Sequence, residues 1–184
     1  MKNLLYFTVG LALLSCVEKT EKNSVYAPQI SEINRLNISL DSSYSIVSNF
    51  DQKALKLIKN KASQKLDSIK TVYTRDTIDP KFEEIALKAR GGLFKTIRNF
   101  LTDISAVDNE YEFCKKQTET LKQNLIHETV NKDEALQYTQ AEKNALILLK
   151  GEIDKQISAI ELVLEMNGPL FEQMDSIIDY HATN

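Results

Sequence analysis

Few side chains in this sequence have the type and spacing that enzyme or metal chemistry requires. Neither of the two histidines, His127 and His181, has a glutamate three residues earlier, because Asn124 and Ile178 stand there. A di-iron helical bundle uses Glu-x-x-His pairs that face inward. The 2 Cys and 2 His form no Cys-x-x-Cys-His haem motif and no zinc-ligand cluster. The sequence therefore predicts no catalytic residue, no metal site and no cofactor.

The stretch RGGLFKT at residues 90–96 is the one local motif that resembles a phosphate-binding loop, since it ends in Lys-Thr. It lacks the glycine directly before the lysine, and no strand precedes it. Two glycines inside a helix cost about 2 kcal/mol relative to alanine. We therefore expect Gly91 and Gly92 to mark a break, a kink or a close helix crossing. The functional alternative is a hinge, or a binding notch lined by Arg90 and Lys95.

The first sixteen residues have the composition of an export signal. A short positive start is followed by an apolar core of about eleven residues, Leu4 to Leu14, well short of the roughly 20 residues that cross a bilayer. The core ends in LLSC at residues 13–16, which resembles the lipobox of bacterial lipoproteins. In that family an aliphatic residue stands three before the cysteine and a small residue directly before it. The resemblance implies cleavage after Ser15 and a thioether-linked diacylglycerol on Cys16.

This resemblance also implies a division of the chain and a location. Residues 1–15 would be a cleaved signal peptide, residues 16–27 a lipidated cysteine with a flexible polar tether, and residues 28–184 the folded domain. The mature protein would be exported and anchored to a membrane of the bacterial cell envelope through Cys16. We expect the outer membrane, with the domain on its periplasmic or surface face.

The composition favours long helices, because a chain of 184 residues with 5 Gly and 3 Pro has few residues for turns. Pro28, Pro80 and Pro169 stand where helices could begin. The Asn-Gly pair before Pro169 predicts that one helix stops and another starts there. Asn131 and Glu134 have the spacing of a capping box, which predicts a further break near residue 131.

Four helical segments are predicted, at about 29–73, 80–130, 132–167 and 170–180. The second carries a heptad seam, typical of coiled-coil-like packing, and Cys114 on that seam is expected to be a buried thiol. The third carries two apolar lines and so needs two neighbours. The seam comprises Leu93, Ile97, Phe100, Ile104, Val107, Tyr111, Cys114, Thr118, Leu121 and Leu125; the second apolar line of the third segment comprises Tyr138, Ala141, Ala145 and Leu148.

The expected fold is all-α: an elongated antiparallel bundle of three long, coiled-coil-like helices plus a short C-terminal helix. A net charge of -3 argues against nucleic-acid binding. Because catalytic motifs are lacking, we expect a non-enzymatic scaffold or adaptor that binds another envelope protein or a second copy of itself. The alternative is a helical-bundle carrier of a lipid or another hydrophobic ligand. An enzyme would need a cleft of carboxylates with shifted pKa values.

Overall fold

The computed structural model describes residues 21–72 and 80–183, and it confirms the all-α fold: this part of the chain contains helices and turns and no strand. The 3-10 turn η1 (Glu21–Asn23) precedes α1 (Ala27–Ser48) and α2 (Gln52–Val72). The chain then forms α3 (Pro80–Leu87), the π-helical segment η2 (Lys88–Phe94) and α4 (Lys95–Ile126), which follow one another directly. The last element is α5 (Lys132–Thr183), a helix of 52 residues.

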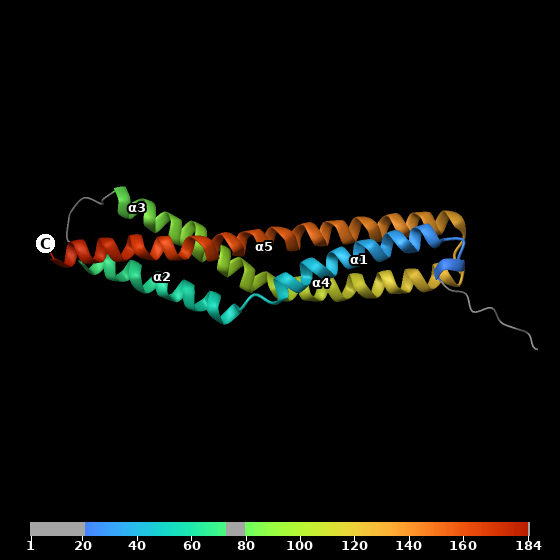
Figure 1. The fold of residues 1–184 in the computed structure, drawn as a ribbon, viewed down its shortest axis with the longest axis horizontal. Helices are drawn as coiled ribbons and strands as arrows, with labels where there is room; N and C mark the ends of the chain where they lie inside the picture. The colour runs from blue at the N-terminus through green and yellow to red at the C-terminus, as the bar shows by residue number, and fades with distance from the viewer. Residues whose placement is uncertain (1–20, 73–79, 184) are drawn as a thin grey trace, which may run out of the picture.

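These elements form a long rod (Figure 1). α1 and α2 follow each other along one side, and α5 runs beside both in the same direction. α3, η2 and α4 return in the opposite direction. The pairs Ser43–Asp154 and Lys65–Asp175 join residues 111 and 110 positions apart. Because the separation barely changes, α1 and α2 keep one register against α5 along the rod.

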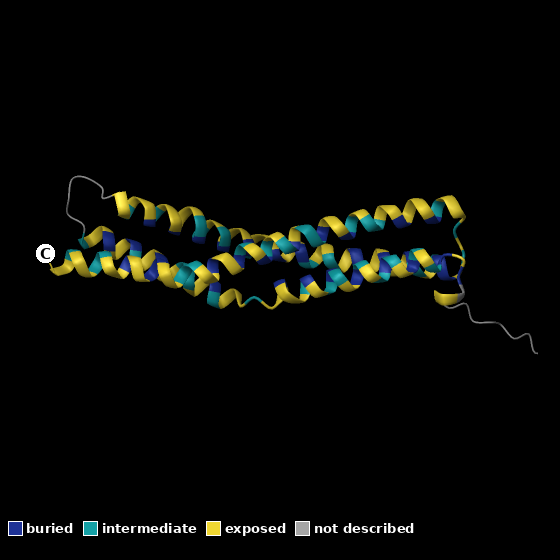
Figure 2. Cartoon of the chain, turned by 45° about the horizontal axis from the view of Figure 1, so that its top comes forward, coloured by how far each residue is buried: buried dark blue, intermediate teal, exposed yellow. Residues whose placement is uncertain are grey.

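Buried positions lie on the inner sides of the helices along the rod (Figure 2), and most of the buried residues are aliphatic. The seam predicted for the second segment is buried from Leu93 to Leu125 except at Tyr111, which is partly exposed. The start of α1 is held against the α4–α5 turn, where the hydroxyl of Ser24 donates to the carbonyl of Leu125 at 2.7 Å and that of Tyr26 to Val130 at 3.0 Å.

The first predicted segment, 29–73, is wrong as a single helix because the chain interrupts it between Ser48 and Gln52. Asp51 caps α2, since its Oδ1 accepts the backbone N–H groups of Lys53 at 2.8 Å and Ala54 at 3.0 Å. Phe50, in the interruption, packs edge-on against Phe100 with ring centroids 5.8 Å apart. The Phe50 side chain therefore packs against the core, although its backbone lies outside both helices.

The predicted stop before Pro169 is also wrong, because α5 continues through this proline. The predicted short C-terminal helix is thus the end of α5. A proline inside a helix removes one backbone donor and crowds the preceding turn. Two features hold the helix together there. The Asn167 amide donates to the carbonyl of Leu164 at 2.5 Å, and Leu170, Phe171 and Met174 are buried in the core.

The predicted break near residue 131 is confirmed, and it has the reciprocal geometry of a capping box. Asn131 Oδ1 accepts the backbone N–H groups of Asp133 and Glu134, both at 3.0 Å. Glu134 Oε2 accepts the backbone N–H of Asn131 at 3.1 Å. The turn before it includes Glu128 at a φ of 55°, a left-handed conformation that ends α4.

Candidate functional site

Gly91 and Gly92 lie in η2, where the helix widens into a π turn without breaking. Neither glycine has a positive φ. A Cβ at Gly91 would meet no atom within 4 Å, and one at Gly92 would lie 3.5 Å from Cε of Met166, an ordinary contact. Space therefore does not demand glycine at either position.

The buried residues explain why the helix widens here. Ile85, Ala89, Leu93 and Ile97 are all buried, and each stands four residues after the one before. In an α-helix of 3.6 residues per turn, each such step would rotate the side chain about 40° around the axis. A π turn holds more residues and offsets this rotation. The three successive four-residue spacings between these buried residues were therefore a signal for η2 in the sequence. The π turn keeps all four side chains on the face toward the core.

A hollow of about 370 Å³ lies between α2 and the helix formed by η2 and α4. Its lining consists of Lys59 from α2, Arg90 and Phe94 from η2, and Lys95 and Arg98 from α4. Arg90 and Lys95 are the residues that the sequence places beside a notch. The others were not singled out, although Arg90, Phe94 and Arg98 stand four residues apart and could have been recognised as one helix face. We call this feature the basic hollow.

The four cations of the basic hollow have no anionic partner within residues 21–72 and 80–183, and no carboxylate is among its lining residues. Several lysines elsewhere on the rod are paired with carboxylates: Lys88 with Glu84 at 2.6 Å and Lys143 with Glu32 at 2.7 Å. The hollow therefore concentrates positive charge that the described structure leaves uncompensated.

A second polar site joins α1 to α4 in the middle of the rod. The rings of Tyr44 and Tyr111 stack with centroids 3.6 Å apart and planes 6° apart. The hydroxyl of Tyr44 donates to Asp108 at 3.0 Å, and that of Tyr111 donates to Asp41 at 2.9 Å. Lys115 Nζ contacts both carboxylate oxygens of Asp41 at 2.9 Å. Sequence periodicity placed Tyr111 on the apolar seam and gave neither tyrosine a polar role.

Burial, followed by the hydrogen bond to Asp41, raises the pKa of Tyr111 to about 12. Burial and the hydrogen bond to Asp108 also raise the pKa of Tyr44. Both phenols thus remain neutral donors in ordinary solution. Their arrangement is that of a structural clamp, since neither hydroxyl is available as a base or nucleophile.

Cys114 is buried, as the heptad seam predicts, with 2% of its surface exposed. Burial raises the pKa of its thiol, and the carboxylates of Glu110 and Glu142 add to this effect. A thiol with a raised pKa is a poor nucleophile. His127 lies exposed at the end of α4, and His181 lies near the end of α5.

The described residues contain no group of three or more His, Cys, Asp or Glu side chains that could hold a metal ion. Within the same ranges no helix is long and apolar enough to cross a membrane. Cys16 lies outside the described residues, so its lipidation stays a prediction.

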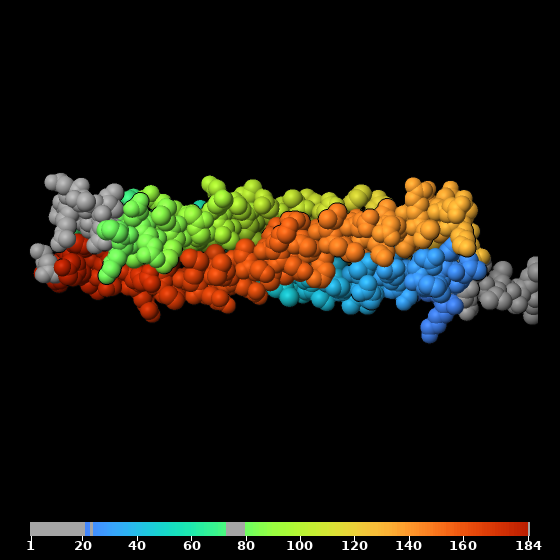
Figure 3. Space-filling model, turned by 90° about the horizontal axis from the view of Figure 1, so that it is seen from above, coloured from blue at the N-terminus to red at the C-terminus, as the bar shows by residue number. Residues whose placement is uncertain are grey.

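Figure 3 shows α5 running from one end of the rod to the other beside α3 and α4. Several apolar side chains are exposed along this helix. Leu148 is 70% exposed and Tyr138 is 46% exposed. The second apolar line predicted for this helix therefore lies largely on the surface. A separate groove of about 490 Å³ lies further along α5, and its lining includes apolar Leu162, Met166 and Leu170 and charged Lys88 and Glu165.

Comparison of the chain with protein-family models, with curated proteins and with solved structures found no match.

Proposed function

We propose that this protein is a membrane-tethered helical adaptor of the bacterial cell envelope. A lipid on Cys16 holds it at a membrane, and the rod presents a helix face to another envelope protein. The observation that carries the proposal is the exposed apolar line on α5, in which Tyr138, Ala141 and Leu148 face solvent. Exposed apolar side chains gathered on one helix are a feature of protein-binding surfaces.

Neighbouring helix surface extends this line. α4 and α5 pack against each other, and the carboxylate of Glu142 on α5 contributes to the raised pKa of the Cys114 thiol on α4. Phe113, the residue before Cys114, is 56% exposed. Because α4 and α5 run in opposite directions, Phe113 stands near the level of Tyr138 and Ala141. We call Phe113, Tyr138, Ala141 and Leu148 the adaptor face.

The adaptor face lies in the half of the rod nearer the tether. Ser24 is hydrogen-bonded to Leu125 beside the α4–α5 turn, so the described chain begins at that end. Leu148 stands 16 residues after Lys132, where α5 begins, which corresponds to about 24 Å along the helix at about 1.5 Å per residue. A partner held in the same membrane could reach this distance with a small domain.

The adaptor proposal includes the finer architecture expected from the sequence, a bundle of three long helices, and adds that this bundle closes within one chain. In it α1 and α2 act as one interrupted member, α3 to α4 as the second, and α5 as the third. The shared register of Ser43–Asp154 and Lys65–Asp175 supports this arrangement. The core forms two apolar clusters inside the rod and leaves the adaptor face free for a partner.

Site-specific photocrosslinking of the anchored, full-length protein tests the adaptor face. A benzophenone amino acid at Leu148 or Tyr138 should capture one defined envelope protein. The matched control places it at Ser158, which is also exposed on α5. Equal capture at all three positions, or none at any, would contradict the adaptor face. A crosslinked dimer of this chain would mean that the adaptor face binds a second copy of the protein and not a different envelope protein.

The tether is tested separately. Replacement C16A should remove the acyl mass from the N-terminal peptide and release the protein from the membrane fraction, because buried acyl methylenes contribute about 0.8 kcal/mol each to membrane binding. If the N-terminal peptide of the unaltered protein carries no lipid, the proposed anchor is wrong. The crosslinking result would then test only the adaptor face.

The second candidate function is transport or storage of a hydrophobic ligand, and the groove around Leu162, Met166 and Leu170 supports it. Its volume of about 490 Å³ falls in the range of small-molecule sites. Native mass spectrometry of the detergent-released protein distinguishes the carrier from the adaptor. An additional mass of a few hundred daltons per chain favours the carrier, and a bare chain favours the adaptor.

A further inference from the structure

We propose that the basic hollow is a binding site for the phosphoryl group of a phosphate monoester with an aromatic or apolar organic part. This site is independent of the adaptor face, because it lies between α2 and the η2–α4 helix and shares no residue with that face. The proposal is carried by the convergence of Lys59, Arg90, Lys95 and Arg98 on one hollow without a carboxylate among its lining residues.

The charge of the hollow selects the class of ligand. Four like charges around one hollow repel one another, and an anion bound there offsets that repulsion. A phosphate monoester carries nearly two negative charges at neutral pH and has three acceptor oxygens. Arg90 and Arg98 each provide a planar fork that matches two of these oxygens, and Lys59 and Lys95 provide further N–H donors. A carboxylate has half the charge and two oxygens.

The positions of the side chains explain how one ligand could reach all of them. Arg90, Phe94 and Arg98 follow one another at intervals of four residues along the helix, and Lys59 faces them from α2. Phe94 is half-buried and lies between the two arginines in sequence. Its ring offers a contact surface that an inorganic ion could not use. The volume of about 370 Å³ is at the lower end of the range for small-molecule sites, so it admits a phosphate with an organic substituent.

The position of the hollow along the rod bears on where the phosphoryl group comes from. Arg98 stands 28 residues before Ile126 at the end of α4, which corresponds to about 42 Å. A soluble phosphate monoester can reach the hollow in any orientation of the rod. A phosphatidate headgroup, which is also a phosphate monoester, can reach it only when the rod lies along a bilayer. The two sources share the phosphoryl chemistry, and the experiment below separates them.

Isothermal titration of the lipid-anchored protein in detergent micelles, at about 0.15 M salt, tests the site with phenyl phosphate, inorganic phosphate and benzoate as probes. Phenyl phosphate should bind once per chain, more tightly than inorganic phosphate and at least about tenfold more tightly than benzoate. The double variant R90Q/R98Q should weaken phenyl phosphate binding by at least about tenfold, because two charge-assisted contacts are lost. The matched variant R35Q/K56Q removes the same charge from exposed positions that do not line the hollow, and it should retain binding.

Vesicle cosedimentation separates the sources. Binding of the full chain to phosphatidate vesicles over phosphatidylcholine vesicles, lost in R90Q/R98Q and competed by phenyl phosphate, assigns the site to a lipid headgroup. If phenyl phosphate binds in the titration and the vesicles do not show this preference, the basic hollow is assigned to a soluble phosphate monoester. Absence of saturable binding to every probe, equal weakening in both double variants, or benzoate binding as tight as phenyl phosphate would each overturn the proposal. Circular dichroism of both double variants checks that the helices remain folded.

Discussion

Tyr44 and Tyr111 lie ring on ring at 3.6 Å, and each phenol donates to an aspartate on the helix of the other tyrosine. A slide of α1 along α4 by one turn would separate the rings and break both hydrogen bonds together. The pair therefore fixes the register of these two helices at a point where aliphatic packing alone would tolerate several registers.

We predict that the clamp is energetically coupled. Replacement Y111F removes one hydrogen bond to a carboxylate and should lower the free energy of unfolding by about 0.5–1.5 kcal/mol. Replacing both rings by leucine should reveal a coupling of about 0.5–1.5 kcal/mol in a double-mutant cycle. Urea denaturation measures both values. Y138F, on the exposed adaptor face, is the control; if it costs as much as Y111F, the clamp does not hold the register.

The clamp also predicts a pH dependence. The folded-state pKa of Tyr111 is about 12, above the ordinary value near 10. Its contribution to stability is complete below pH 10 and is lost as the pH rises toward 12, because the unfolded state loses the proton first. Stability of the unaltered protein should therefore fall more steeply between pH 10 and 12 than that of Y111F. Parallel pH profiles for the two proteins would contradict the raised pKa.

Pro169 is expected to destabilise α5. Replacement P169A restores a backbone donor inside a continuous helix and should raise the free energy of unfolding, by up to about 3 kcal/mol. Pro28 provides the matched control, because it lies in the first turn of α1, where proline is tolerated. P28A should change stability little. A loss of stability in P169A, measured by thermal denaturation, would mean that the proline maintains a local bend on which the packing of Phe171 depends.

The glycines of η2 can be tested in the same way. A Cβ at Gly91 meets nothing and one at Gly92 makes an ordinary contact with Met166, so G91A and G92A should each stabilise the fold by about 0.5–1 kcal/mol. G151A, at another helical glycine with open surroundings, is the control and should behave alike. Destabilisation by G92A alone would show that η2 requires close contact with α5 at this point.

Cys114 should react slowly with thiol reagents in the folded protein, because burial both shields the sulfur and raises its pKa. An engineered cysteine at Lys116, which is exposed two residues later, provides the control in a C114A background. Ellman's reagent should label that control much faster than Cys114, and urea should make the two rates similar. Fast labelling of Cys114 without urea would place it outside the core.

Sequence periodicity predicted the elements whose packing depends on local spacing. The heptad seam from Leu93 to Leu125 is buried apart from Tyr111, and the Asn131–Glu134 capping box forms as its spacing indicates. Both depend on residues within a few turns of one another. The stop at Pro169 failed because burial of residues after the proline, a tertiary effect, outweighs a local signal for helix termination.

The candidate sites required knowledge of neighbours that the sequence does not provide. The notch residues Arg90 and Lys95 could be named, but Lys59 enters the basic hollow only because α2 packs beside η2 and α4. Tyr44 and Tyr111 had the spacing of ordinary core positions, and their aspartate partners lie 64 and 70 residues away. Long-range pairs of this kind leave no periodic pattern in one sequence.

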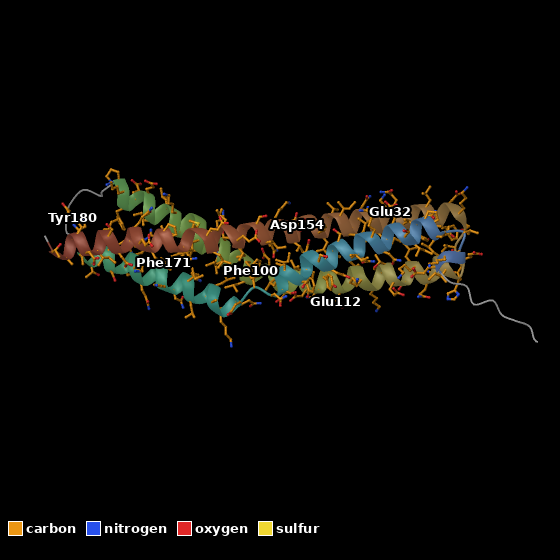
Figure 4. The ribbon with its side chains drawn as sticks, in the orientation of Figure 1. Glu32, Phe100, Glu112, Asp154, Phe171 and Tyr180 are labelled. Atoms are coloured by element: carbon orange, nitrogen blue, oxygen red, sulfur yellow. The ribbon has the colours of Figure 1, made fainter. Side chains whose placement is uncertain are left out.

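The irregular backbone of the rod is concentrated near one level. The interruption at Phe50 lies against Phe100, which Figure 4 labels, and η2 lies against Met166 on α5, three residues before Pro169. α5 alone, of the described helices, passes this level without leaving α-helical geometry. A force that bends the rod would therefore act mainly at this level. α5 would resist the bending, because the other two members, α1–α2 and α3–η2–α4, have irregular backbone there. Because one core cluster, with members from Leu40 to Met174, crosses this level, bending there would disturb the packing on both sides.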